Sequence, residues 1–286
     1  MDIQKVLEQY RSGEIDLTTA EEKIRSMGFL AVSDIAKIDT FRCRRTGVPE
    51  AVLAEGKKTA NLIQIVRAQV DANGRVLVTR VSKKKLKALK DEFDFVATGK
   101  NSTTCVVHDG KTERKADGGL VAFISAGTAD ISVLEEAKMT AEEMGCRTIE
   151  IYDVGVAGYH RLILEMNKLT DFKPDAVVVA AGREGTLPTV VAGMIDAPVI
   201  ALPVSTGYGA GANGKAALLA MLQSCSVISV VNIDAGFVAG AYAARIANRM
   251  EKLRNKKSAC TENDIDMDET DGKIVTHNCK KGRKNK

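Results

Sequence analysis

The chain has 286 residues, of which 45% are hydrophobic, 27% are charged and 4% are aromatic, and its formal net charge is +4. This length exceeds the usual size of one domain, so we expect two domains followed by a tail. Few rings and no tryptophan argue against a nucleic-acid-binding platform. The basic runs at 83–85 and 280–286 form no patterned face, so we interpret them as solvated charge and expect no nucleic-acid partner.

The cysteines give information about the compartment. No two of them have CxxC spacing, which argues against both a disulfide framework and a zinc site. No apolar run approaches the length of a membrane span, and the first ten residues are typical of an amphipathic helix rather than a signal peptide. We therefore expect a cytoplasmic protein without a membrane partner and with reduced thiols. The six cysteines are Cys43, Cys105, Cys146, Cys225, Cys260 and Cys279.

Residues 1–116 are predicted to form a smaller N-terminal domain, helical at first and then mixed α/β. Apolar spacing predicts a helix near residues 3–10, a capping box of Thr18 and Glu21 predicts a second, and 32–39 is predicted as a third. After a basic, turn-rich stretch, segments 62–68 and 75–81 have strand character, with a turn signal between them. A helix over 84–92 and a short strand over 105–107 complete this domain.

Residues 117–252 show a regular alternation of short apolar runs and helical segments. Such an alternation is typical of a doubly wound parallel sheet with right-handed crossovers, here of about five strands. A final helix is predicted from about 237 to 252. Residues 253–286 are poor in apolar side chains, acidic first and then basic, and we expect a disordered tail there. The five apolar runs are 120–124, 148–152, 176–180, 199–202 and 227–231.

Glycines, acids and hydroxyls follow the predicted strands, at the edge where parallel sheets bind ligands. The turn 125–130 could present amides to an anion, or could be an ordinary turn capped by Thr128 or Asp130. Glu184 lies in a glycine-flanked loop, where it is either a functional carboxylate or a solvent-facing acid. Segment 205–214 holds four glycines, which suit close approach to a ligand or a flexible connection.

Two further candidates remain open on spacing alone. Cys225 ends a predicted helix, and a lone cysteine is most often a small buried hydrophobe rather than a nucleophile. His160 is either a satisfied residue at the start of a helix or an acid or base.

A set of motifs resembles the LarB family of nickel-pincer nucleotide cofactor biosynthesis, and the resemblance covers about residues 30–250. That family shares its C-terminal domain with PurE, the aminoimidazole ribonucleotide carboxylase (mutase) of purine synthesis. The resemblance therefore implies a PurE-like sheet in the C-terminal domain. The matching segments are 125–130, 153–161, 182–188, 197–203 and 231–234, together with 36–57 in the N-terminal domain.

The resemblance also implies a reaction: carboxylation of the pyridinium ring of nicotinic acid adenine dinucleotide at carbon 5, with hydrolysis of its phosphoanhydride. The products would be pyridinium-3,5-biscarboxylic acid mononucleotide and AMP. Cys225 would add to the ring as nucleophile and Glu184 would transfer a proton. The implied substrate-binding residues are Ser125, Gly127, Thr128, Asp130, Asp153, His160, Arg161, Gly182, Gly207, Tyr208 and Gly209.

The same resemblance implies a homo-oligomer, with an octamer expected, and carbon dioxide or bicarbonate as co-substrate. We expect no required cofactor, and no ligand spacing demands a divalent metal, although one is possible. Two rival functions are aminoimidazole ribonucleotide carboxylation and non-catalytic nucleotide binding. PurE has a histidine in the loop matching 182–188, which has none here, and its ligand ring is already electron-rich. The residues after Cys225 and at 235–238 depart from the LarB pattern.

Overall fold

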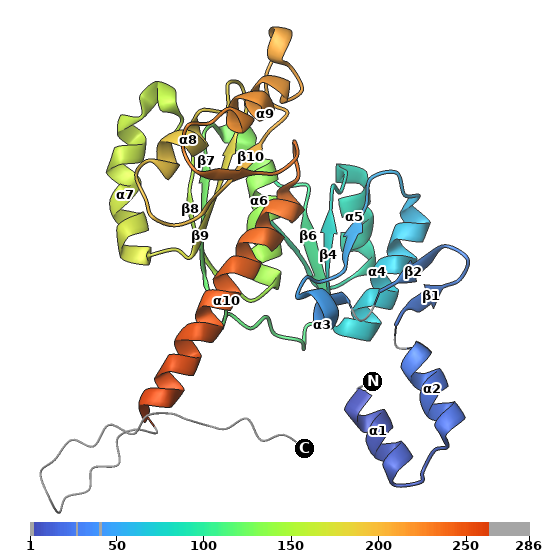
Figure 1. The fold of residues 1–286 in the computed structure, drawn as a ribbon. Helices are drawn as coiled ribbons and strands as arrows, with labels where there is room; N and C mark the ends of the chain where they lie inside the picture. The colour runs from blue at the N-terminus through green and yellow to red at the C-terminus, as the bar shows by residue number, and fades with distance from the viewer. Residues whose placement is uncertain (1–2, 27, 40–41, 263–286) are drawn as a thin grey trace, which may run out of the picture.

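The computed structural model describes residues 3–26, 28–39 and 42–262. Figure 1 shows a larger domain built around β7–β10 beside a smaller domain that contains β4 and β6. A helical hairpin of α1 (Ile3–Arg11) and α2 (Leu17–Ser26) lies at the outer end of the smaller domain. Asp16 caps α2, because its Oδ1 accepts a hydrogen bond of 2.7 Å from the Thr19 amide. The cap therefore lies before the predicted Thr18.

The segment predicted as a third helix is instead an antiparallel pair of strands, β1 (Leu30–Val32) and β2 (Ala36–Ile38). Ser33 has a φ of 45° and turns the chain between the strands. Val32 and Ile38 are buried against the core of the smaller domain, which fixes the register of the pair. Tertiary burial thus decides between helix and strand for a segment too short to show either period.

The smaller domain is a four-stranded sheet in the order β3-β4-β6-β5, covered by helices. The segment predicted as a strand over 62–68 belongs to a helix, in which Leu62, Ile65 and Val66 recur at helical spacing and pack on the sheet. Gly74, with a φ of 74°, ends that helix. The elements are α3 (Arg42–Thr46), β3 (Ala51–Leu53), α4 (Thr59–Asn73), β4 (Arg75–Thr79), α5 (Lys83–Glu92), β5 (Val96–Thr98) and β6 (Cys105–His108).

The larger domain confirms the predicted PurE-like α/β fold. Its five strands are all parallel in the order β11-β10-β9-β7-β8. The strands are β7 (Leu120–Ser125), β8 (Arg147–Ile151), β9 (Ala176–Ala181), β10 (Val199–Pro203) and β11 (Ile228–Val230). The helices are α6 (Ile131–Glu143), α7 (His160–Phe172), α8 (Leu187–Ala192), α9 (Lys215–Leu222) and α10 (Gly236–Glu262).

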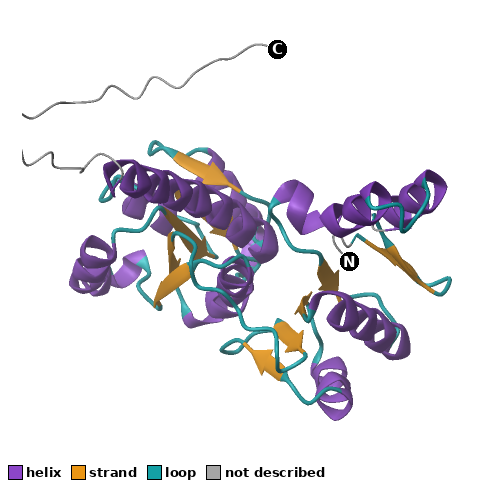
Figure 2. Ribbon diagram, turned by 90° about the horizontal axis from the view of Figure 1, so that it is seen from below, coloured by secondary structure: helices purple, strands orange, loops and turns teal. Residues whose placement is uncertain are grey.

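Alternate residues of the strands feed two cores, one on each face of the sheet. Phe123 and Val178 point toward α6 and α10, whereas Ile124 and Val177 point toward α7, α8 and α9. Both faces are therefore buried, which explains why the strands are continuously apolar. Figure 2, seen from below, shows the strands of this domain lying between helices.

The last helix is longer than predicted, since α10 continues past Lys252 to Glu262. The first ten residues of the segment expected to be a tail are therefore helical. They lack glycine and proline, and Arg254 adds support by bonding to Glu251 at 2.6 Å and to Asp175. The rest of the predicted tail, 263–286, lies outside the described residues.

The two domains are packed against each other. Arg75 of β4 donates two hydrogen bonds of 3.0 and 2.8 Å to Glu143 of α6. The Lys100 amide donates to the buried Glu135 of α6 at 3.0 Å. Leu77 and Met139 share a small apolar cluster across the boundary. The smaller domain thus contacts the helix that follows directly on the turn at Asp130, and this turn lines the site described next.

Candidate active site

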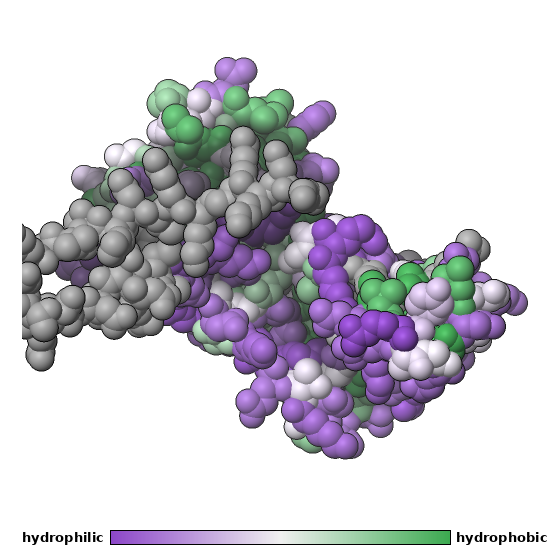
Figure 3. All heavy atoms as spheres, turned by 60° about the horizontal axis from the view of Figure 1, so that its bottom comes forward, coloured by the Kyte–Doolittle hydropathy of each residue, from purple (hydrophilic) through white to green (hydrophobic). Residues whose placement is uncertain are grey.

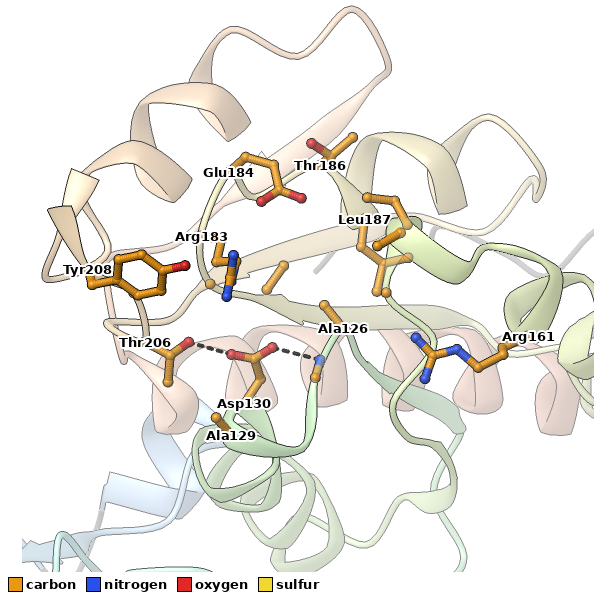
Figure 4. Close-up of a pocket in the computed structure, with 17 residues that line it drawn as sticks. Ala126, Ala129, Asp130, Arg161, Arg183, Glu184, Thr186, Leu187, Thr206 and Tyr208 are labelled. Carbon is orange, nitrogen blue, oxygen red and sulfur yellow. Dashed lines mark hydrogen bonds between the residues drawn. The ribbon is translucent and has the colours of Figure 1, made fainter. Parts of the chain in front are cut away.

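A cavity of about 390 Å³ lies at the carboxyl ends of β7, β9 and β10. Four connections wall it: the turn after β7, the segment before α7, the glycine-flanked loop after β9 and the loop after β10. In Figure 4, Glu184 and Thr186 lie on one side of the cavity and Asp130 and Thr206 on the other, while Tyr208 and Arg161 lie at opposite ends. This is the edge at which the sequence predicted a ligand.

Asp130 is a buried carboxylate that joins two of these walls. One oxygen accepts a hydrogen bond of 2.9 Å from the Gly127 amide, and the other accepts 2.7 Å from the Thr206 hydroxyl. Burial raises the pKa of Asp130, although both hydrogen bonds oppose that rise. Asp130 therefore closes its own turn, as the capping interpretation holds, and also lines the cavity.

The loop after β9 brings Glu184 to the cavity. Arg183 has a φ of 46°, a strained conformation for a residue with a side chain, and its guanidinium lies 5.0 Å from the centre of the Tyr208 ring. A Cβ on Gly182 would lie 2.0 Å from the Thr206 hydroxyl oxygen, so this position requires glycine. The loop leaves Glu184 exposed, where a ligand can reach its carboxylate.

Arg161 supplies positive charge at the other end of the cavity. It pairs with Asp153 at 2.7 Å, and the Asp153 amide donates to the buried Ser125 hydroxyl at 3.2 Å. Asp153 has a φ of 59°, which turns the chain away from β8. Ser125 and Asp153 thus lie behind the wall and hold Arg161, which itself lines the cavity together with glycine-rich turns. A guanidinium at the wall of a cavity is a suitable partner for an anionic group.

The structure divides the predicted site residues into three groups. Ser125 and Asp153 support the wall, whereas Thr128, His160 and Gly209 are exposed and line no part of the cavity. Three polar side chains that line the cavity were not among the predicted site residues, although each lies inside a segment that the sequence analysis singled out: Arg183, Thr186 and Thr206. The predicted residues that line the cavity are Gly127, Asp130, Arg161, Gly182, Glu184, Gly207 and Tyr208.

Within one chain, Cys225 lies away from this cavity. It is exposed in the connection between α9 and β11, so it is not the buried hydrophobe that base rates favour. Ser226 donates to the Thr189 carbonyl at 2.9 Å, which holds this connection against α8. Ile228 is in register with Val199 at the start of β10, so Cys225 lies near the amino ends of the strands. The cavity is at the opposite ends, about 13 Å along β10 at 3.3 Å per residue.

Within 3–26, 28–39 and 42–262, no group of three or more histidine, cysteine, aspartate or glutamate side chains is placed to hold a metal ion. Over the same residues, every helix is too short or too polar to cross a membrane.

Comparison with known proteins gives matches in both domains. Residues 30–109 match the LarB/PurE-like N-terminal domain, and residues 120–266 match AIR carboxylase. An uncharacterized protein of Methanocaldococcus jannaschii is 38% identical over 260 residues, which cover 88% of this chain and 99% of that protein. The N5-carboxyaminoimidazole ribonucleotide mutase of the same organism is 31% identical over 143 residues, which cover 49% of this chain and 83% of that enzyme.

Proposed function

Because the chain belongs to the LarB family, with a carboxylase-type domain of the PurE family after its N-terminal domain, we propose that it carboxylates a pyridinium dinucleotide. The substrate is nicotinic acid adenine dinucleotide, and carbon dioxide or bicarbonate is the co-substrate. The products are pyridinium-3,5-biscarboxylic acid mononucleotide and AMP, which form when ring carboxylation is coupled to hydrolysis of the phosphoanhydride.

The observation that carries this proposal is the cavity at the strand ends. It presents an aromatic ring at one end, a guanidinium at the other and a free carboxylate between them: Tyr208, Arg161 and Glu184. A nucleotide substrate offers matching groups, since its ring can stack on an aromatic side chain and its phosphates can pair with arginine and backbone amides.

The chemistry needs a nucleophile before it needs a base. A pyridinium carbon is electron-poor and does not attack carbon dioxide. Addition of the Cys225 thiolate forms a carbon–sulfur bond and gives a neutral dihydropyridine, whose carbon 5 is enamine-like. That carbon forms the new bond to carbon dioxide. Loss of the carbon 5 proton and cleavage of the carbon–sulfur bond then restore the aromatic ring and release the thiolate, which suits both steps.

Glu184 is the proposed acceptor of the carbon 5 proton. Its carboxylate is exposed to the cavity and lies on the side facing Asp130 and Thr206, so a ring bound between the two sides would lie within its reach. Asp130 is unsuited to this role because hydrogen bonds from Gly127 and Thr206 occupy both of its oxygens.

Within one chain, Cys225 lies near the amino ends of the strands and Glu184 lies at their carboxyl ends. We therefore propose that Cys225 acts as the nucleophile in the cavity of a neighbouring copy. The side chains around Cys225 support an interface, since Leu219, Leu222 and Val227 are 57%, 62% and 95% exposed. Burial of apolar side chains of this kind is what drives homo-oligomers to form. A homo-octamer is the assembly we expect.

A second candidate function is carboxylation of aminoimidazole ribonucleotide, which the match to AIR carboxylase and the related mutase favours. Among the described residues that line the cavity there is no histidine, in contrast to the loop expected of PurE. A third candidate is nucleotide binding without turnover.

One assay separates these functions. Purified protein is given nicotinic acid adenine dinucleotide with bicarbonate, or aminoimidazole ribonucleotide with bicarbonate, and the products are identified by mass. A carboxylated mononucleotide together with AMP supports the proposal, and Cys225→Ser should abolish it. Turnover of aminoimidazole ribonucleotide alone would refute it, and binding without turnover of either compound would leave the non-catalytic function. Repeating the assay with a chelator measures any dependence on a divalent metal.

A further inference from the structure

A second cavity, of about 450 Å³, lies between the two domains. The smaller domain contributes the carboxyl end of β4 and the start of α5, and the larger domain contributes the first turns of α6 and the turn before α10. In Figure 1 the first turn of α10 faces the smaller domain. Arg80, Glu136 and Asp234 line this cavity together.

Arg80 bridges the domain boundary at this second cavity. It follows β4 directly and has a φ of 52°, a conformation that costs free energy for any residue except glycine. Its guanidinium donates 3.1 Å to a carboxylate oxygen of Glu55 in the smaller domain. It also donates 3.3 Å to the main-chain carbonyl of Asp234 in the larger one. The strained backbone thus directs the side chain across the domain boundary.

Asp234 holds the chain where it leaves β10. It too has a positive φ, of 53°. Its amide donates to the Pro203 carbonyl at 2.9 Å, and its carboxylate accepts from the Ser205 amide at 2.9 Å. These two bonds lie on either side of Val204, so the position of Asp234 sets the direction in which the loop after β10 begins.

That loop forms one wall of the candidate active site. Directly after Ser205, the Thr206 hydroxyl donates to Asp130, and the Thr206 carbonyl accepts from the Arg183 amide at 3.1 Å. Gly207 and Tyr208 follow and line the cavity. A continuous series of contacts therefore runs from Arg80 through Asp234 to this wall.

We propose that Arg80 is a positioning residue, which acts from the N-terminal domain through the Asp234 turn to fix the 205–208 wall of the substrate cavity. Only the turnover test of this inference rests on the proposed function, because the exchange test needs no substrate. The inference also assigns a role to the smaller domain, whose described residues contribute no side chain to the lining of that cavity.

If Arg80 only stabilised the fold, its loss would lower the unfolding midpoint and speed amide exchange throughout the chain. A positioning role predicts a different result. The Arg80 side chain is 44% exposed, and exposed ion pairs contribute little to stability. Loss of its guanidinium should therefore leave the unfolding midpoint nearly unchanged and act locally on the loop after β10. Arg67 provides a matched control, because its side chain is 50% exposed and pairs with Glu92 within the smaller domain, away from the boundary.

The test compares Arg80→Gln, Arg80→Lys and Arg67→Gln in the full-length chain by hydrogen–deuterium exchange. Amides of peptides covering 203–208 and 232–236 should exchange about fivefold faster in Arg80→Gln, the factor expected for loss of one hydrogen bond. Exchange in β9 and in the middle of α10 should stay unchanged. Arg67→Gln should match the wild type throughout, and Arg80→Lys should recover part of the protection because lysine keeps one charged donor.

Turnover gives a second readout. In Arg80→Gln the KM for the dinucleotide should rise about fivefold while kcat stays within about twofold, since the wall is loosened but the reacting groups are intact.

Exchange at 203–208 that is as slow in Arg80→Gln as in the wild type would overturn the inference. Uniformly faster exchange with a lower unfolding midpoint would overturn it too. Should Arg80→Gln fail to fold, Glu55→Gln removes the partner that orients Arg80 and should give a smaller local rise, whose absence would also overturn it. Absence of turnover in the wild type would refute the proposed function but leave the exchange test intact.

Discussion

Asp130 illustrates how one residue couples ionisation to the shape of the site. Its pKa in the folded protein lies above the ordinary value because burial penalises the charged form. The folded state therefore holds its proton to higher pH than the unfolded state does. The free energy of unfolding contributed by this group falls as pH rises from the ordinary pKa through the raised one, and is level above it.

Asp130→Asn should remove that dependence on pH. The asparagine oxygen can keep one of the two hydrogen bonds, so the variant should be about 1 kcal/mol less stable than the wild type in acid. The difference should shrink as the pH rises, because the wild type then carries the cost of a buried charge. Urea unfolding of both proteins between about pH 3.5 and 7 measures it. A difference that stays constant with pH would show that Asp130 does not titrate in this range.

The cysteines should differ sharply in reactivity. Burial raises the pKa of Cys105 and of Cys146 to about 12, whereas Cys43 and Cys225 are exposed. Because the thiolate is the reactive form, iodoacetamide near pH 8 should modify Cys43 and Cys225 and spare the buried pair. Peptide mass spectrometry provides the readout. The proposed function adds that the dinucleotide should protect Cys225 and leave Cys43 unprotected, and equal protection of both would contradict it.

At this scale the sequence predicts some site residues better than others. Glu184 and Asp130 could be predicted because each follows a recognisable strand, and parallel strands end at one edge. Cys225 precedes its strand, so the same rule places it at the opposite ends of the strands, away from the cavity, and the sequence does not encode whether a neighbouring copy brings a cavity to it. Arg183 was passed over because its role depends on a contact with Tyr208 from another loop.

At the scale of elements, close packing of α10 on α6 determines how the sheet is covered. A Cβ on Gly240 would lie 2.0 Å from the Ala137 carbonyl oxygen, so Gly240→Ala must push α10 away from α6. We expect a loss of roughly 1–3 kcal/mol, the usual cost of overpacking. Chemical denaturation measures it. Gly193→Ala is the control, because its nearest atoms lie at 3.5 Å and its φ is −79°, and it should be neutral or slightly stabilising.

The elements that the sequence predicted wrongly share a physical cause. Residues 62–68 carry β-branched and apolar side chains, which suit both a strand and one face of a buried helix, and only packing on β4 and β6 selects the helix. The sequence predicts that the last helix ends near Lys252, ten residues before the observed end at Glu262, because few apolar residues follow Lys252. Helix propensity and the ion pairs of Arg254 extend it without an apolar face.

At the scale of the whole molecule, large apolar side chains are exposed on both domains. In Figure 3 hydrophobic groups are visible on both domains, with hydrophilic residues between them. On the larger domain the exposed set includes Leu164, Leu222 and Val227. These residues belong to the helix layer and the connection near Cys225, on the side of the sheet opposite α6 and α10. A neighbouring copy packed there would bury them, and the proposed function requires that this copy also bring its cavity to Cys225.

That arrangement predicts complementation between two inactive variants. Cys225→Ser keeps Glu184 and Glu184→Gln keeps Cys225, so each variant alone should lack turnover. In mixed assemblies formed by co-expression, a site is complete when an intact cavity meets an intact cysteine from its neighbour. With equal amounts and random assembly this occurs in about one quarter of the sites, which sets the expected activity relative to the wild type. If both groups acted within one chain, the mixed assemblies would stay inactive.

The control mixes the two purified variants under conditions without subunit exchange, and this mixture should remain inactive. Light scattering of the wild type should report an assembly larger than a monomer at every concentration that supports turnover.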